Sequence, residues 1–398
     1  LERTSVQVKQ RSGAHICEWK TGMGGAGMIT IGAQHLFDGH MMSGGAVVTV
    51  EGDHIAAVDA ADPSATAGCD YHAAWLTPGL IDIDSGIGLK EESLGVEGND
   101  LNESTDAVTP EMQALDGLTP YDSSLAKALM GGVTTALVMP GGSNVIGGRG
   151  AIVHLAGATA AEMCIRAPFG VKFSLGNDPK QTHGQKRTPM TRMGNAFLVR
   201  DVLMRARDYK EKKKEYNMKY EALLPLLAGD DVAFIRALRS DDIVTAMRLA
   251  EEFGLRYVVT GAYDADLVAE QLKARSVSVA FGPLIMSRTD EEARRLHPAN
   301  AGELLEAGVD TAVISGHPNY PEKYLHMSLG FLVGQGIPAD RVLSTVTSVP
   351  ARMLGLEGFG EIRPGAIADL ALFGAEPWEP AGVVDLTMVA GKPVYTRS

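Results

Sequence analysis

Cysteine is scarce in this chain of 398 residues. The three cysteines, Cys17, Cys69 and Cys164, are odd in number and include no Cys-x-x-Cys spacing, which excludes a zinc knuckle and a disulfide framework. Long apolar runs are also missing, and no stretch approaches the roughly 18 residues needed to span a bilayer. We therefore expect buried or idle thiols and no membrane span.

The first 25 residues lack the basic segment followed by an apolar segment that marks a secretory signal. This absence favours a cytoplasmic location. Because the sequence begins at Leu1 rather than at methionine, an exported or periplasmic location stays open as an expectation.

Basic residues are in the minority. Lysine and arginine number 36 against 49 aspartates and glutamates, which gives a formal net charge of -13. Phosphate binding needs a concentrated basic face, so this balance disfavours a nucleic-acid partner. The one basic cluster, around residues 210–219, alternates with acidic residues. We interpret it as the solvated face of a helix, with nucleic-acid binding as the weaker alternative.

Short alternating strands are expected near both ends of the chain. Residues 28–76 contain MITIGAQHLF and GGAVVTVEGDHIAAVDA, separated by glycine and aspartate turn signals. Residues 356–398 contain ADLALFGAE, GVVDLTMVAG and KPVYT. The two clusters predict a small composite β-sandwich, and residues 1–27, which show no helical period, are interpreted as an N-terminal arm.

The middle of the chain, residues 77–355, alternates strand-like apolar runs with amphipathic helices. In residues 240–254, Ser240 is placed as an N-cap, apolar residues recur on one helical face and Gly254 ends the helix. Such alternation is typical of parallel strands with crossover helices. The sequence therefore predicts an α/β fold with a TIM-type (β/α)8 barrel, in which ligands gather at the carboxyl ends of the strands.

A glycine-rich run, PGGSNVIGGRG at residues 140–150, raises the alternative of a phosphate cradle, because successive backbone amides can bind an anion. The run lacks the Gly-Lys-Ser/Thr ending of a P-loop and the Gly-x-Gly-x-x-Gly spacing of a dinucleotide site. We interpret it as a tight loop at the end of a barrel strand. If that loop borders a pocket, Asn144 and Arg149 are the expected contacts.

Several segments together carry a resemblance to a known family. They are PGLID at residues 78–82, ALMGGVTTALVMPGGSNVIGGRG, GVKFSLGNDPK followed by TPMTRMG, and the closing LGLEGFGEIRPGAIADLALF. From about Met28 to Tyr395 the chain resembles the amidohydrolase superfamily, in its imidazolonepropionase-like and prolidase-like branch. The resemblance implies a barrel with a β-sandwich. In the family, zinc or another divalent metal activates water for the hydrolysis of C–N bonds.

The resemblance also implies six positions at which family members carry metal-binding or catalytic side chains. In this sequence the six positions hold Asp84, Gly86, Arg236, Leu238, Thr260 and Gly316. Only the first of these side chains suits a metal, and an arginine would repel one. We therefore predict a degenerate site without a metal or any other cofactor.

Charged side chains, those of Asp84, Lys172 and Arg236, are expected where family members hold the metal. Lys172 lies on GVKFSLG, where related branches use a carboxylated lysine to bridge two metals, and we expect it to pair with Asp84 because a buried unpaired charge is costly. Arg236 is expected to fill an emptied metal position with a fixed positive charge. His317 is interpreted as an orienting or satisfied histidine, with a substrate contact or general base as the alternative.

A new metal site built from Asp82, Asp84, Lys172 and His317 is a further alternative. It is disfavoured because a lysine must be neutral or modified to act as a ligand, and oxygen-rich sites need more donors. The catalytic candidates are Asp84, Lys172 and His317. The expected pocket-lining residues are Asn144, Arg149, Lys172, Asn177 and Arg192.

The leading functional hypothesis is a pseudoenzyme that serves as a structural or regulatory subunit. Its expected partner is a homologous, metal-containing amidohydrolase, or a second copy of the chain. The first alternative is a hydrolase or lyase that acts on C–N bonds of cyclic or linear amides through a non-standard, metal-independent site. The second is a sensor that binds a small molecule and has lost turnover.

Overall fold

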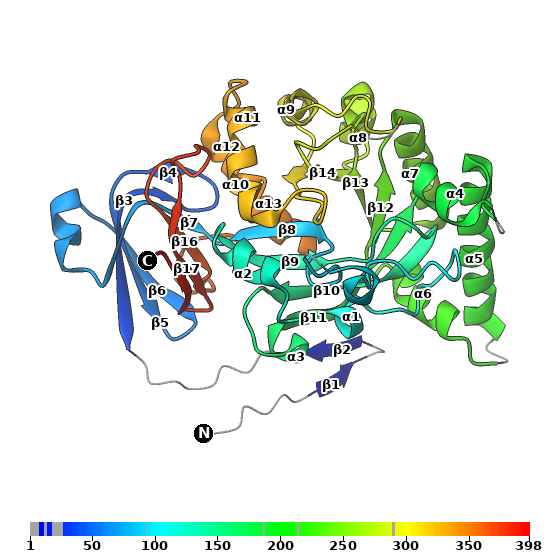
Figure 1. Ribbon diagram of the computed structural model, residues 1–398, viewed down its shortest axis with the longest axis horizontal. Helices are drawn as coiled ribbons and strands as arrows, with labels where there is room; N and C mark the ends of the chain where they lie inside the picture. The colour runs from blue at the N-terminus through cyan, green and yellow to red at the C-terminus, as the bar shows by residue number, and fades with distance from the viewer. Residues whose placement is uncertain are drawn as a thin grey trace.

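The computed structural model contains a barrel-like sheet surrounded by helices and a second sheet at one end (Figure 1). None of the helices in the described part of the chain combines the length and apolar character needed to cross a membrane. The structure describes residues 8–11, 14–17, 27–92, 94–185, 188–212, 215–288 and 291–398.

Eight strands form the barrel-like sheet. Its strands are β8 (Leu80–Ser85), β9 (Val133–Val138), β10 (Ile146–His154), β11 (Cys164–Ser174), β12 (Ala233–Ala237), β13 (Tyr257–Gly261), β14 (Ser278–Phe281) and β15 (Thr311–Val313), and neighbours in this order are paired. The outer strands β8 and β15 are linked beyond the ladder, because the Gly86 amide donates to the His317 carbonyl at 3.0 Å. The expected α/β barrel architecture is confirmed.

One strand departs from the expected parallel pattern. β10 runs antiparallel to both β9 and β11, whereas the other neighbouring pairs are parallel. The loop 139–145 is too short for a crossover helix, so the chain turns back as a hairpin. The glycine-rich run therefore supplies both this loop and the first half of β10.

The helices lie on the outside of the barrel and in the loops at its ends (Figure 1). The α-helices are α1 (Ala114–Gly117), α2 (Ser123–Leu129), α3 (Ala160–Met163), α4 (Asn177–His183), α5 (Arg192–Lys212), α6 (Met218–Ala228), α7 (Ser240–Phe253), α8 (Ala269–Ala274), α9 (Pro298–Ala307), α10 (Leu325–Ser328), α11 (Gly330–Val333), α12 (Ala339–Ser344) and α13 (Ser348–Leu354). The 3-10 helices are η1 (Pro63–Gly68), η2 (Val96–Gly98), η3 (Ala265–Val268) and η4 (Glu322–Tyr324).

Helix α7 shows how local sequence sets an element. Its apolar face is buried, as expected, and Gly254 ends it in the left-handed conformation with φ +67°. The expected N-cap was wrong by one residue, because the helix already includes Ser240 and the cap position is Arg239, which makes no side-chain cap bond.

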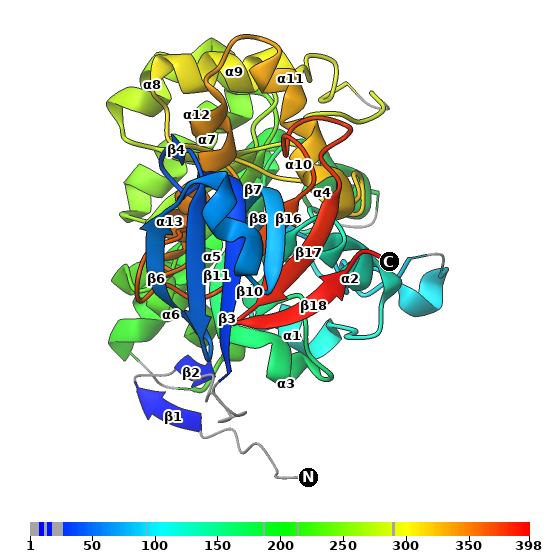
Figure 2. The same cartoon turned by 90° about the vertical axis from the view of Figure 1, so that its left-hand side faces the viewer.

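The second sheet combines both ends of the chain. Its strand order is β18-β17-β16-β7-β3-β5-β6, with β4 paired to β3. The N-terminal strands are β3 (Met28–Phe37), β4 (Met42–Ser43), β5 (Ala46–Glu51), β6 (His54–Ala60) and β7 (Tyr71–Pro78), and the C-terminal strands are β16 (Leu370–Phe373), β17 (Val384–Val389) and β18 (Lys392–Thr396). Figure 2 looks onto this sheet, with the blue strands β3, β5 and β6 and the red strands β17 and β18 in one layer. Local alternation at both chain ends thus gives one sheet built from both termini, which is consistent with the predicted composite β-sandwich.

A short hairpin belongs to the N-terminal segment. β1 (Val8–Arg11) pairs antiparallel with β2 (Ala14–Cys17), and β2 lies beside β11 at the barrel (Figure 1). The remainder of the predicted arm, residues 1–7, 12–13 and 18–26, lies outside the described residues.

Candidate functional site

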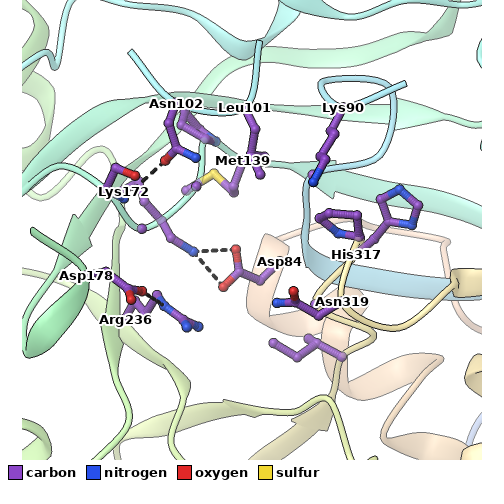
Figure 3. Close-up of a pocket in the computed structure, with 18 of the residues that line it drawn as sticks. Asp84, Lys90, Leu101, Asn102, Met139, Lys172, Asp178, Arg236, His317 and Asn319 are labelled. Atoms are coloured by element: carbon purple, nitrogen blue, oxygen red, sulfur yellow. Dashed lines mark hydrogen bonds and ion pairs between the residues drawn. The ribbon is translucent and has the colours of Figure 1, made fainter. Parts of the chain in front are cut away.

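A polar cavity of about 360 Å³ lies at the carboxyl ends of the barrel strands (Figure 3). Its walls come from the ends of β8, β11 and β12, from the loops after β9, β14 and β15, and from α4. The charged side chains in this lining are those of Asp84, Lys90, Lys172, Asp178 and Arg236. The cavity occupies the end of the barrel where the sequence predicts the site.

Strand alternation directs the key side chains into the barrel. Phe234 belongs to the apolar cluster inside the sheet, and Arg236 follows two residues later on the same face. Lys172 of β11 is paired in register with Phe234 and therefore faces the same interior. The barrel interior is apolar around Phe234 and becomes charged towards the mouth.

Lys172 and Asp84 form a buried ion pair, as predicted. The Lys172 ammonium lies 2.5 Å from Asp84 Oδ1 and 2.6 Å from Oδ2, and the two side chains are only 3% and 11% exposed. Burial lowers the pKa of Lys172, and the Asp84 carboxylate partly offsets that shift. Both oxygens of Asp84 thus contact one ammonium group, which competes with a metal ion or a substrate proton for this carboxylate.

Arg236 forms the second charge pair of the cavity. Its Nε donates to Asp178 Oδ2 at 2.9 Å, and the two residues lie below the Lys172–Asp84 pair in Figure 3. Burial opposes the charge on Arg236, but Asp178 and other neighbours more than compensate and raise its pKa. The expected positive charge at this family ligand position is therefore present, and it is permanent.

Two of the six family positions are glycines in tight surroundings. A Cβ atom at Gly86 would lie 3.0 Å from the His317 carbonyl oxygen and closer still to the Leu101 side chain. Gly316 has φ +59°, a conformation that disfavours other residues, and a Cβ there would lie 3.0 Å from Pro283. The backbone at these two positions is fitted to glycine and does not readily admit a ligating side chain.

The remaining two family positions do not line the cavity. Leu238 is 4% exposed and packs in the main core beside β12. Thr260 is fully buried on β13, and its Oγ1 has no hydrogen-bond partner among the described residues. Of the six positions, the structure therefore brings Asp84, Gly86, Arg236 and Gly316 to the cavity.

His317 lies in the cavity wall. Burial lowers its pKa, so the imidazole is neutral at neutral pH. Its backbone amide donates to Ser315 Oγ at 3.1 Å, while its Nδ1 is buried without a hydrogen-bond partner among the residues that the structure describes. The interpretation of a fully satisfied histidine does not hold for this ring.

Four of the five expected pocket-lining residues are engaged outside the cavity, and Lys172 alone lines it. Asn144 donates to Thr109 Oγ1, and Arg149 pairs with Asp231 near the opposite end of the barrel. The backbone amide of Asn177 donates to Glu292. Arg192 pairs with Asp241, Asp242 and Glu292. The antiparallel course of β10 explains why Arg149 does not line the cavity, because the strand carries that residue away from the mouth.

Lys90 and Asp178 line the cavity although no sequence motif predicted them. Asp178 lies in the first turn of α4, just after β11, and its carboxylate is held against Arg236. Lys90 lies in the loop after β8 and points into the cavity beside His317 (Figure 3). Both residues follow a barrel strand closely, which is the available signal, since site residues collect in these loops.

Asp82 does not join the cavity. Its Oδ2 accepts hydrogen bonds from the Ser315 amide at 3.0 Å and from the Ser315 hydroxyl, which ties β8 to the segment after β15. Burial raises the pKa of Asp82 to about 6 although these bonds oppose the shift. With Asp84 held by Lys172, the set Asp82, Asp84, Lys172 and His317 does not fit a cation. The described residues contain no group of three or more His, Cys, Asp or Glu side chains suited to a metal.

Glu292 is expected to make stability depend on pH. Burial and the neighbouring carboxylates Asp178 and Asp242 raise its pKa from 4.5 to about 7, so the folded protein binds this proton more tightly than the unfolded chain does. The stability it contributes is present at low pH and is lost as the pH rises from about 4.5 through about 7. Urea denaturation should therefore show that the free energy of unfolding of the Glu292→Gln variant rises relative to that of the wild type between pH 5 and pH 8. A pH-independent difference between the two proteins would contradict this.

Comparison with known proteins agrees with the fold. A model of the Amidohydrolase family matches residues 233–394. The crystal structure of an amidohydrolase from Thermotoga maritima MSB8 is similar over 93% of this chain and 100% of that one, with 32% sequence identity and a TM-score of 0.87. The chain belongs to the amidohydrolase family.

Two further proteins show the breadth of the similarity. Amidohydrolase tasK from Hapsidospora irregularis is 28% identical over 348 residues, which are 77% of this chain and 35% of that protein. The chain thus spans about a third of the length of this curated relative. A prolidase complexed with N-methylphosphonate-L-proline is 14% identical, with a TM-score of 0.60 over 93% of this chain and 100% of that one, a likeness in fold alone.

Proposed function

We propose that this chain is a non-catalytic amidohydrolase that serves as a structural or regulatory subunit beside a metal-containing homologue. The observation that carries the proposal is the pair formed by Lys172 and Asp84, in which one ammonium group engages both carboxylate oxygens. Asp84 is the one metal-compatible side chain at the six family positions. Internal charge pairs stand where ligands for a divalent cation are expected, so the fold is kept without the means to activate water.

An exposed apolar stripe supports the existence of a partner. On α5, Met193, Phe197 and Met204 are 78%, 62% and 57% exposed, and their spacings of four and seven residues place them on one helical face. Large exposed apolar groups gathered on one face are typical of protein contacts. A related barrel with an equivalent stripe would bury both faces on association.

Isolation from the native source without an affinity tag tests this role. We expect a homologous, metal-containing chain to co-purify with the wild type, and to be lost with Phe197→Glu. The matched control is Met41→Glu, which places the same charge at a 61% exposed apolar side chain beside the second sheet. Recovery of this chain alone, from both the wild type and the control, would sink the proposal.

The open cavity favours a second, compatible role in binding a small molecule. The cavity holds about 360 Å³ and is lined by side-chain amides, such as those of Asn102 and Asn319, as well as by charged groups. Metal-independent hydrolysis through Asp84, Lys172 and His317 has less support, because a carboxylate bonded twice to an ammonium group is a poor general base. A regulatory subunit that senses a ligand fits both observations.

A further inference from the structure

Arg236 has donors to spare inside the cavity. A guanidinium group offers five N–H donors in a plane, and only Nε is engaged, by Asp178. The terminal nitrogens have no hydrogen-bond partner among the described residues, and the side chain remains 22% exposed in the cavity lining. A planar fork of N–H groups in this situation matches a planar, two-oxygen anion.

The charge of the cavity also favours an anion. Its charged lining residues comprise three cations, Lys90, Lys172 and Arg236, and two carboxylates, Asp84 and Asp178, which leaves one excess positive charge. His317 adds none, because burial keeps it neutral. The whole chain carries a formal net charge of -13, so the cavity differs in sign from the molecule around it.

Lys90 provides a second cation with N–H donors that are free among the described residues. Lys172 is ion-paired with both oxygens of Asp84, whereas Lys90 makes no ion pair within the described residues. Figure 3 shows Lys90 reaching into the cavity from the loop after β8. Arg236 and Lys90 come from different elements and line the same cavity. A ligand with an anionic group at each end would satisfy both.

We propose that the barrel mouth binds a small dicarboxylate, with one carboxylate on the terminal nitrogens of Arg236 and the other on Lys90. This rests on the ligand-binding role proposed above and adds the chemical class of the ligand. The side chains of Asn102 and Asn319 also line the cavity. In this proposal the positive charge comes from the side chains of Arg236 and Lys90, where family members have a metal ion, and it binds the ligand's carboxylates.

Isothermal titration of the wild type with glutarate, pentanoate, glutaramide and inorganic phosphate tests the proposal. Because the charges and the planar geometry both contribute, glutarate is expected to bind at least about tenfold more tightly than the other three probes. This arm needs no variant, so loss of folding cannot obscure it. Equal binding of glutarate and glutaramide, or of glutarate and phosphate, would overturn the assignment.

Two variants locate the contacts. Arg236→Lys keeps the charge but removes the fork, and we expect it to weaken glutarate binding at least about tenfold. Lys90→Gln should abolish the preference for glutarate over pentanoate, while the control Arg363→Lys, an exposed residue of the C-terminal segment, should change nothing. Glutaramide binding without glutarate binding would refute the dicarboxylate and leave the ligand-binding role standing. Absence of binding by all four probes would count against the dicarboxylate, while co-purification decides the subunit role separately.

Discussion

Replacement of Asp84 by alanine is expected to lower the free energy of unfolding by about 3–5 kcal/mol, because it leaves the Lys172 charge buried without a partner. The Lys172 side chain is 3% exposed, and its ammonium has hydrogen bonds to Asp84 at 2.5 and 2.6 Å. The described residues give this ammonium no hydrogen-bond acceptor other than Asp84, so the variant leaves the desolvation cost of the charge without its main compensation. Urea denaturation of the variant and the wild type at pH 7 measures the effect.

A double variant and a surface pair provide the controls. Asp84→Leu combined with Lys172→Met removes both charges, and it should recover most of the stability that the single variant loses. Glu92→Ala breaks the exposed pair with Lys127, whose side chains are 40% and 46% exposed, and should cost less than about 1 kcal/mol. A loss below about 1 kcal/mol for Asp84→Ala would show that the pair is not the central element of the mouth.

Histidines introduced at two of the six family positions, 84 and 86, are expected to damage the fold rather than build a metal site. The double variant Asp84→His, Gly86→His removes the partner of Lys172 and inserts a side chain at Gly86, where a Cβ would lie 3.0 Å from the His317 carbonyl oxygen. The two costs, an unpaired buried charge and overpacking, together amount to at least about 4 kcal/mol. Chemical denaturation and zinc content after dialysis are the measurements.

The single variant Asp84→His separates the two costs, since it keeps Gly86. We expect it to be more stable than the double variant by about 1–3 kcal/mol, the usual cost of overpacking. A double variant that holds one zinc ion per chain and unfolds at the wild-type urea concentration would show that the mouth still accommodates the ancestral site.

Most of the fold could be predicted from the sequence, because its signals are local. Strand alternation near both chain ends indicates the composite sheet, and the PGLID segment indicates β8. The Lys172–Asp84 pair was also predictable, since both residues lie near the carboxyl ends of barrel strands, where their side chains point into the barrel. The antiparallel β10 was not predicted, although the short loop 139–145 that forces it is visible in the sequence.

The partners within the site depend on tertiary structure. Asp178 and Arg236 are 58 residues apart in the sequence, and their contact exists only because α4 begins beside the end of β12. Arg149 was expected at the mouth, but β10 carries it back to pair with Asp231. Glu292 reaches the start of α4 from the loop after β14, a contact that no local pattern announces. Side chains on long loops are placed by the packed elements around them.

Elemental mass spectrometry of the natively purified chain tests the central claim most directly. Our account predicts less than one metal ion per copy of this chain. Asp84 is ion-paired with Lys172, and Arg236 stands at another of the six family positions. Where a homologous chain co-purifies, the metal should follow that chain through separation of the two. One tightly held metal ion per copy of this chain would contradict the account and return the protein to the metal-dependent hydrolases.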